Sequence, residues 1–156
     1  MMMTTRTQAS AIEIRLAGLG DAAVMAALHA ASFARSWDAG AMVQFLGAPG
    51  CISLLALTAE GEPPQGLLIA RRASDEAELL TLAVHPNCRR LGLARALLTA
   101  AIGALRASGA KQLFLEVEEG NAPARFLYQS LGAVAVGRRP GYYEHGADAA
   151  IFSLAL

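Results

Sequence analysis

Hydrophobic and polar residues alternate with two different periods along the 156-residue chain, which predicts a mixture of strands and helices. Seven short segments either alternate between apolar and polar residues or are continuously apolar, as is typical of strands. They are residues 12–16, 51–58, 66–71, 76–84, 112–118, 134–138 and 149–156. In the first, isoleucine or leucine alternates with a charged residue, which indicates a strand with one buried face.

Four further segments place apolar residues three or four positions apart, which predicts helices with one apolar face. The first helix begins after Asp21, an expected N-cap, and ends before Trp37. Its apolar positions are Val24, Met25, Leu28 and Ala31, with Phe33 at the end. The second helix covers residues 38–46. The third begins near Leu93 and ends at an expected C-cap, Gly109. The fourth runs from the expected N-cap Asn121 to Leu131.

Residues 39–59 contain no charged side chain and are long enough to be tested as a membrane span. Pro49, between Gly47 and Gly50, lies in the middle of this stretch and would break a spanning helix. The pattern therefore predicts a helix, a turn and a strand here. No membrane association is expected.

The long third helix connects two strands, residues 76–84 and 112–118, and such a crossover implies that these strands pair in parallel. The other strands follow one another closely, as in hairpins, so the sheet is expected to be mixed. A chain of this length forms one domain or two very small ones. We expect one domain over residues 1–156, with residues 1–10 as a flexible start.

The charged residues balance, with 13 Lys and Arg against 13 Asp and Glu. This balance argues against a general nucleic-acid binder, which must neutralise many phosphates. The composition is 54% hydrophobic, which is typical of a globular chain. Cys51 and Cys88 belong to no Cys-x-x-Cys motif, and the amino terminus lacks the apolar core of a signal peptide. We expect reduced thiols in a cytoplasmic protein. His29, His85 and His145 share no ligand spacing, so no metal is expected.

The first candidate for chemistry is Arg89-Arg90-Leu91-Gly92-Leu93-Ala94, between a strand and the start of the long helix. A helix N-terminus offers unpaired N–H groups to an anion, and small residues let a phosphate approach the backbone. Neither the Gly-x-Gly-x-x-Gly motif nor a Walker lysine motif is present. An ordinary basic helix start explains the same residues equally well.

The second candidate is the pair Glu116 and Tyr128, a carboxylate in a strand and a phenol in the helix after it. Both are expected near the carboxyl edge of the parallel strands, where such sheets bind ligands. The alternative is a solvated strand residue and a core aromatic.

Three segments together resemble the GNAT acetyltransferases. They are Arg89-x-x-Gly92-x-Ala94, Leu115-Glu116-Val117 and Asn121-x-Pro123-Ala124-x-x-Leu127-Tyr128-x-x-Leu131-Gly132. The resemblance covers about residues 12–156. It implies an α/β (α+β) fold with a mixed, mostly antiparallel seven-stranded sheet, about four helices and central parallel strands that splay apart. The Glu116 to Tyr128 spacing, Arg138-Arg139-x-x-Tyr142-Tyr143 and Phe33 to Trp37 are most similar to the RimI-type group, which acetylates the amino-terminal alanine of protein eighteen of the small ribosomal subunit.

The resemblance implies roles for individual residues. Glu116 would be the general base, acting through water, and Tyr128 would protonate the departing thiolate. Acetyl-CoA, as co-substrate, would contact Leu82, Ala83, Val84, Arg89, Arg90, Leu91, Gly92, Leu93, Ala94 and Asn121. Phe33, Trp37, Tyr142 and Tyr143 would line the acceptor site. Ala94 replaces a frequent glycine, Cys88 a frequent aromatic residue, and Ala133 a phenylalanine.

The function implied is acetyl transfer to a protein α-amine, with the basic N-terminal tail of a ribosomal protein as acceptor, by a monomer or weak dimer that binds no nucleic acid directly. One alternative is a GNAT enzyme for a small amine such as a polyamine, an aminoglycoside or an amino acid. The other is a non-catalytic acyl-CoA-binding sensor, which would have no use for both Glu116 and Tyr128.

Overall fold

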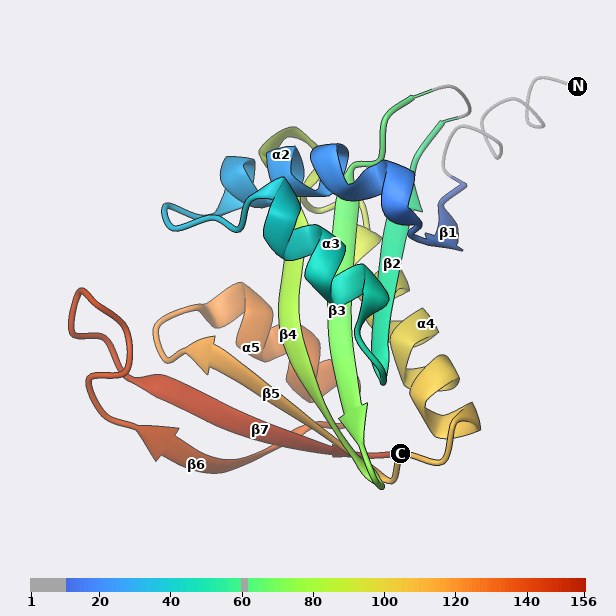
Figure 1. Cartoon of the computed structure of the whole chain (residues 1–156). Coiled ribbons are helices and arrows are strands. Elements are labelled where there is room, and N and C mark those ends of the chain that lie inside the picture. The colour runs from blue at the N-terminus through green and yellow to red at the C-terminus, as the bar shows by residue number, and fades with distance from the viewer. Residues whose placement is uncertain (1–10, 60–61) are drawn as a thin grey trace, which may run out of the picture. The chain divides into compact units, whose positions relative to one another are not determined.

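The computed structural model describes residues 11–59 and 62–156 (Figure 1). The expected flexible start at residues 1–10 lies outside the described residues. All seven predicted strands form. They are β1 (Glu13–Leu16), β2 (Cys51–Leu57), β3 (Gly66–Ala73), β4 (Glu76–Val84), β5 (Gln112–Glu118), β6 (Val134–Arg139) and β7 (Ala149–Ala155). They make one mixed sheet in the order β1-β2-β3-β4-β5-β7-β6. The predicted fold class is confirmed.

The four predicted helices also form. Three agree within one or two residues at both ends, while the first, predicted to end before Trp37, ends already at Ser32. The four helices are α2 (Ala22–Ser32), α3 (Ala39–Gly47), α4 (Leu93–Ala107) and α5 (Ala122–Ser130), with short 3-10 turns η1 (Leu19–Asp21) and η2 (Pro86–Cys88). Asp38 accepts a hydrogen bond from the Ala41 N–H at 2.9 Å and so caps α3. Asn121 caps α5 through the Ala124 N–H at 3.2 Å. Gly109, just beyond α4, has the left-handed φ of +101° expected of a C-cap glycine.

The parallel pairing between β4 and β5 is confirmed and short. It covers three residue pairs, from Glu76 and Gln112 to Glu78 and Phe114. β5 is antiparallel to β7 over its whole length, and β7 is antiparallel to β6 with an irregularity between Ala135 and Gly137. β4 and β5 thus share a ladder only at their starts, as the expected splay requires.

The chain divides into two units, and each is described by itself. Of the described residues, the first unit comprises 11–59, 62–70 and 81–101, and the second comprises 71–80 and 102–156. In the first unit, α2 and α3 lie side by side in front of β2 and β3 (Figure 1). The core of this unit contains Met25, Met42, Leu55, Leu68 and Leu97, all fully buried.

The second unit is built on the antiparallel strands β5 and β7. Leu113, Leu115 and Val117 alternate along β5 as buried residues, while Phe152 of β7 is completely buried. Tyr128 of α5 contacts Phe152 edge-on, with ring centroids 6.0 Å apart. Every residue of the edge strand β6 is exposed.

Two details of α2 differ from the prediction. Asp21 occupies the N-cap position but does not cap the helix, because it closes η1 with helical backbone angles and its carboxylate turns back to Gly18 N–H (2.8 Å) and the Arg15 guanidinium (2.9 Å). These two bonds lower the pKa of Asp21. Ala31, expected on the apolar face, is exposed, whereas His29 is buried and 3% exposed.

The uncharged stretch 39–59 forms α3, a turn and β2, as predicted. Across residues 11–59 and 62–156, every helix is too short or too polar to cross a membrane.

Candidate active site

The turn between η2 and α4 has a backbone suited to an anion. Arg90 and Gly92 both adopt left-handed conformations, with φ of +67° and +88°. The N–H groups of the first turn of α4 have no acceptor within the helix and carry the positive end of its dipole. Arg89, Arg90, Leu91 and Gly92 are exposed, whereas Leu93 is buried and Ala94 is half-buried. Such a turn can hold a diphosphate.

The carboxyl end of β4 is held next to this turn. The Val84 carbonyl accepts hydrogen bonds from Arg89 Nε and from Ser32 Oγ, both at 3.3 Å. Ala83 is buried, and Leu82 and Val84 on either side of it are half-buried. Nearby, the Cys88 thiol donates to Gln65 Oε1 at 3.4 Å. The end of β4 and the turn at residues 89–94, which we call the anion turn, therefore form one continuous surface of the first unit.

Phe33 and Trp37, the predicted acceptor-site residues of the first unit, gather around a buried histidine. The His29 ring stacks on Trp37 at 4.6 Å and contacts Phe33 at 4.5 Å between centroids. Trp37 also contacts Phe45 of α3 at 4.8 Å. The segment between α2 and α3 is thus fixed by packing of four rings.

Glu116, the predicted base, is half-buried on β5 and forms an ion pair. Its Oε1 lies 3.2 Å from Nη2 of Arg139, which reaches it from β6 across β7. Glu116 also lines a cavity of about 330 Å³, together with Arg139, Phe114 and Ile151 among others. The carboxylate is therefore accessible from a space large enough for several water molecules.

Tyr128, the predicted acid, is 5% exposed. Burial, and after it an interaction with Tyr143, raises the pKa of Tyr128 to about 12. Burial, followed by the charge of Glu116, raises the pKa of Tyr143. Tyr143 is therefore an electrostatic neighbour of both predicted catalytic residues, and the second unit brings Glu116, Tyr128 and Tyr143 into one region.

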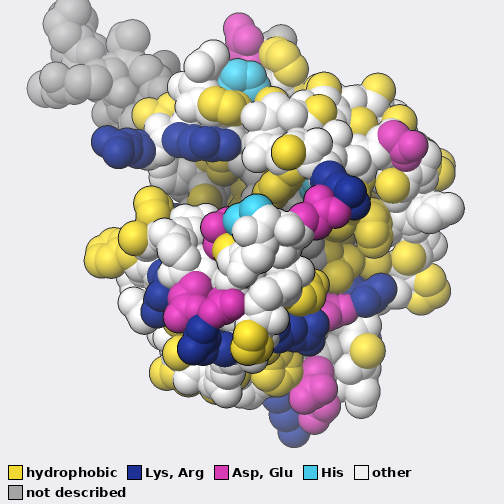
Figure 2. Space-filling model, turned by 90° about the vertical axis from the view of Figure 1, so that its left-hand side faces the viewer, with side chains coloured by type: hydrophobic (Ala, Val, Ile, Leu, Met, Phe, Trp, Pro, Cys, Tyr) yellow, Lys and Arg dark blue, Asp and Glu magenta, His cyan; other side chains and the backbone are white. Residues whose placement is uncertain are grey.

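The loop 140–148 that carries Tyr142 and Tyr143 is fastened at both ends. Asp148 pairs with Arg138 and accepts from the Gly141 N–H at 2.7 Å, and these contacts lower the pKa of Asp148. His145 Nε2 lies 3.0 Å from Glu118 Oε1. Figure 2 shows acidic and basic side chains interleaved on the face that carries this loop.

The exposed Tyr142 ring lies beneath the Arg139 guanidinium, 5.3 Å from its centre, and meets Tyr143 edge-on at 5.1 Å. Tyr142, Tyr143 and Arg139 thus form one aromatic and cationic surface.

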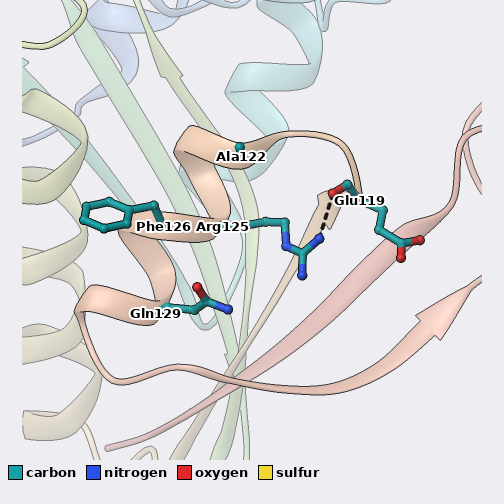
Figure 3. Close-up of a pocket in the computed structure, with 5 residues that line it drawn as sticks. All are labelled: Glu119, Ala122, Arg125, Phe126 and Gln129. Atoms are coloured by element: carbon teal, nitrogen blue, oxygen red, sulfur yellow. Dashed lines mark hydrogen bonds between the residues drawn. The ribbon is translucent and has the colours of Figure 1, made fainter.

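Asn121 is predicted to contact the co-substrate. Its side-chain oxygen accepts the hydrogen bond that caps α5, which leaves its NH₂ group as a donor. A pocket of about 240 Å³ lies on the same helix (Figure 3). There the Arg125 side chain points to the Glu119 backbone carbonyl at 2.9 Å, while the Phe126 ring points away from it and is 71% exposed. None of the predicted catalytic residues lines this pocket.

Residues 22–133 of the chain match the model of the Acetyltransferase (GNAT) family, which is 112 of 156 residues. The chain belongs to the GNAT acetyltransferase family. GNAT enzymes use acetyl-CoA, and the predicted resemblance is thereby confirmed at the family level.

Among individual GNAT proteins, the chain is similar to two [ribosomal protein bS18]-alanine N-acetyltransferases. It is 46% identical to that of Escherichia coli K12 over 69 residues, which are 44% of this chain and 47% of the relative. It is 43% identical to that of Haemophilus ducreyi over 75 residues, 48% of this chain and 52% of the relative. The chain spans about half the length of these curated relatives.

The fold agrees over nearly the whole chain. The crystal structure of the Escherichia coli ribosomal-protein-S18-alanine N-acetyltransferase matches with a TM-score of 0.84 and 28% identity, covering 93% of this chain and 94% of that one. The acetyl-CoA complex of yncA from Salmonella typhimurium matches with a TM-score of 0.80 and 23% identity, over 94% of both chains. The latter likeness concerns the GNAT fold alone.

The anion turn fits the diphosphate of acetyl-CoA. A Cβ at Gly92 would have room, since the nearest atom, Ile12 Cδ1, would be 3.9 Å away. The left-handed φ nevertheless strains any residue with a side chain, so the position suits glycine. The exposed arginines supply positive charge. Within the described residues, no three His, Cys, Asp or Glu side chains are grouped so that they could hold a metal ion.

Two residues with evident contacts in the site carried no assigned role in the sequence prediction. Arg139 belongs to a motif that the sequence offers, but its pairing with Glu116 depends on the register of β6 on β7. His29 falls on an apolar helix face, where only its spacing from Met25 gives a signal of burial.

Proposed function

We propose that this GNAT protein transfers the acetyl group of acetyl-CoA to the amino-terminal α-amine of a protein, with the alanine terminus of ribosomal protein bS18 as the expected acceptor. The observation that carries the proposal is the similarity to bS18-alanine N-acetyltransferases, at 43–46% identity over half the chain. The placement of Glu116, Tyr143 and Tyr128 in one region of the second unit supports it.

Bound acetyl-CoA supplies an activated acetyl group as a thioester. In the proposed assignment, Arg89 to Ala94 hold its diphosphate, Leu82 to Val84 offer backbone groups along the strand end, and the Asn121 amide donates from the start of α5. Glu116 removes a proton from the acceptor ammonium group through water in the adjoining cavity. Tyr128 holds a proton for the departing thiolate.

The protonation of Tyr128 suits the role of an acid. With a pKa of about 12, its phenol keeps the proton at any pH at which the enzyme is expected to work. A free thiol has a pKa of about 8.5, so the departing thiolate takes up a proton at neutral pH. Tyr128 can therefore only give a proton, never accept one, in its resting form.

The energetics of the amine favour an N-terminal acceptor over lysine. An α-amine with a pKa of about 7.8 is neutral at pH 7 at a cost of roughly 1 kcal/mol, whereas a lysine amine near 10.4 costs roughly 4.6 kcal/mol. A single carboxylate acting through water is better matched to the smaller free energy of deprotonation, that of the α-amine. The aromatic residues Phe33, Trp37, Tyr142 and Tyr143 would line the acceptor's path.

The test is thiol release from acetyl-CoA with two versions of one basic peptide. One version has a free amino-terminal alanine, and the other has that amine blocked and its lysines free. Turnover with the free terminus alone supports the proposal. Turnover with neither peptide, while acetyl-CoA binds, contradicts it and favours a small-amine acceptor or a sensor.

A further inference from the structure

His29 is a buried titratable residue with two hydrogen bonds that the proposed mechanism does not use. Its Nδ1 accepts from the backbone N–H of Trp37 at 3.0 Å. Its Nε2 lies 3.1 Å from Oγ1 of Thr81 on β4. The ring is 3% exposed, so both nitrogen atoms depend on these partners rather than on water.

These two bonds determine the tautomer. A backbone N–H can only donate, so Nδ1 must carry a lone pair and the proton must reside on Nε2, which donates it to the Thr81 hydroxyl. His29 is therefore neutral in the folded protein. Burial favours the same state, since it lowers the pKa of His29.

The same contacts tie the segment between α2 and α3 to the strand that carries the expected co-substrate surface. Thr81 lies three residues before Val84 on β4, and Ser32, the last residue of α2, donates to the Val84 carbonyl. The ring of His29 also stacks on the Trp37 side chain with an interplanar angle of 16°. Backbone and side chain of Trp37 are thus both held by one histidine.

We infer that His29 is a positioning residue for the acceptor: its Nδ1 fixes Trp37, and Thr81 accepts from the Nε2–H of the tautomer that makes this possible. The inference rests on the proposed function, in which Trp37 lines the acceptor's path. Because the partners of the His29 ring are Phe33, Trp37 and Thr81, its role is in acceptor binding and not in the proton transfers.

Two substitutions of His29 test the roles of its two ring nitrogens separately. The side-chain oxygen of His29→Asn occupies the place of Nδ1 and keeps an acceptor for the Trp37 N–H. The side-chain amide of His29→Gln reaches toward Thr81 and leaves the Trp37 N–H without its acceptor. Thr81→Val removes the hydroxyl that accepts from Nε2–H and leaves this buried donor without a partner, whereas Thr81→Ser keeps the hydroxyl. Ser53→Ala, which removes another buried hydroxyl of the first unit, is the control.

The steady-state readout is the Michaelis constant for the alanine peptide. His29→Gln and Thr81→Val are expected to raise it about tenfold, while His29→Asn, Thr81→Ser and Ser53→Ala change it less than about threefold. The kcat and the Michaelis constant for acetyl-CoA should remain as in the unchanged protein. The inference would be overturned if His29→Asn and His29→Gln raised the Michaelis constant for the peptide equally. It would also be overturned if the variants raised the Michaelis constant for acetyl-CoA as much as that for the peptide.

Trp37 is the only tryptophan of the chain, so its fluorescence reports the same contact without any turnover. We expect the emission to shift to longer wavelength in His29→Gln and Thr81→Val, to shift less in His29→Asn, which keeps an acceptor for the Trp37 N–H but loses the stacked ring, and to stay unchanged in Thr81→Ser. Unshifted emission in all four variants would contradict the inference. If the unchanged protein acetylates no peptide, the proposed function fails, whereas the fluorescence pattern still decides whether His29 fixes Trp37.

Discussion

Arg139 holds Glu116 from two strands away. The guanidinium reaches across β7 to place Nη2 3.2 Å from Glu116 Oε1, and it also lies over the Tyr142 ring. The arginine side chain is 53% exposed and the glutamate 30%, so water screens the pair and it adds little to stability. What it adds is a defined direction for the carboxylate beside the cavity.

Arg139→Gln is therefore expected to lower kcat about tenfold, since positioning of a base contributes a part of the 10²–10⁴-fold that such groups supply. The thermal midpoint should not change, because the pair is exposed. Steady-state kinetics and a melting curve on the same sample check both statements. Arg15→Gln, which breaks the partly exposed ion pair with Asp21 and does not line the cavity, is the control for kcat. An unchanged kcat would show that Glu116 needs no such partner.

Glu116→Gln is expected to slow acetyl transfer at pH 7 and to move the pH–rate profile upward, toward the range above about 7.8 where an α-amine is neutral without help. The measurement is kcat/KM for the alanine peptide from pH 6 to 9. Glu118→Gln, two positions along the same strand, should leave the profile in place. If the profile of Glu116→Gln coincides with that of the unchanged protein, another group is the base.

Tyr128→Phe is expected to reduce kcat by about 10²-fold or more while acetyl-CoA binds as before. The ring keeps its contact with Phe152, so the fold should tolerate the change. Because the pKa of Tyr128 is about 12, its phenol remains protonated throughout the ordinary assay range. The unchanged enzyme should therefore show no alkaline loss of kcat up to about pH 10, whereas an acid of ordinary pKa near 10 would begin to lose its proton there.

Gly92→Ala is expected to raise the Michaelis constant for acetyl-CoA severalfold and to destabilise the fold by roughly 1 kcal/mol, because φ at this position is +88°. Gly103→Ala is the control: it lies within α4, where a Cβ would contact nothing, and should stabilise the helix by up to about 1 kcal/mol. Substrate kinetics and melting curves distinguish the two variants. A normal acetyl-CoA constant in Gly92→Ala would place the diphosphate elsewhere.

Asp148→Ala is expected to raise the Michaelis constant for the peptide by releasing the loop with Tyr142 and Tyr143. Asp148→Asn should act more weakly, since its oxygen can still accept from the Gly141 N–H. The pKa of Asp148 is below its ordinary 3.8, so the contribution of this carboxylate is complete above that value and is lost as the pH falls through the lower folded-state pKa. The loop is thus expected to keep its anchor at every assay pH above 5. Equal constants for all three proteins would contradict the anchoring role.

The elements of the fold could be predicted almost residue by residue, because their signals are local. The N-cap Asn121, the C-cap Gly109 and the apolar face of α4 act within one or two turns of chain. Asp21 illustrates the limit. Its residue type favoured a cap, but a neighbouring arginine and a 3-10 turn compete for the same carboxylate.

Residues of the site could be predicted as motifs but not as contacts. The ion pair of Glu116 and Arg139 depends on a register across two strand pairings, and the bond between His29 and Thr81 joins positions 52 residues apart. Such contacts follow from the tertiary arrangement, which hydrophobic periodicity does not encode.

The left-handed conformation of Arg90 implies that a substitution which stabilises the fold at this position would lower activity. An arginine at φ of +67° strains the backbone by roughly 1–2 kcal/mol, and a glycine would relieve that strain. The same glycine would remove a cation from the anion turn. A search for heat-resistant variants of this protein should therefore recover Arg90→Gly readily when it selects for folding alone, and lose it when it selects for turnover at low acetyl-CoA concentration.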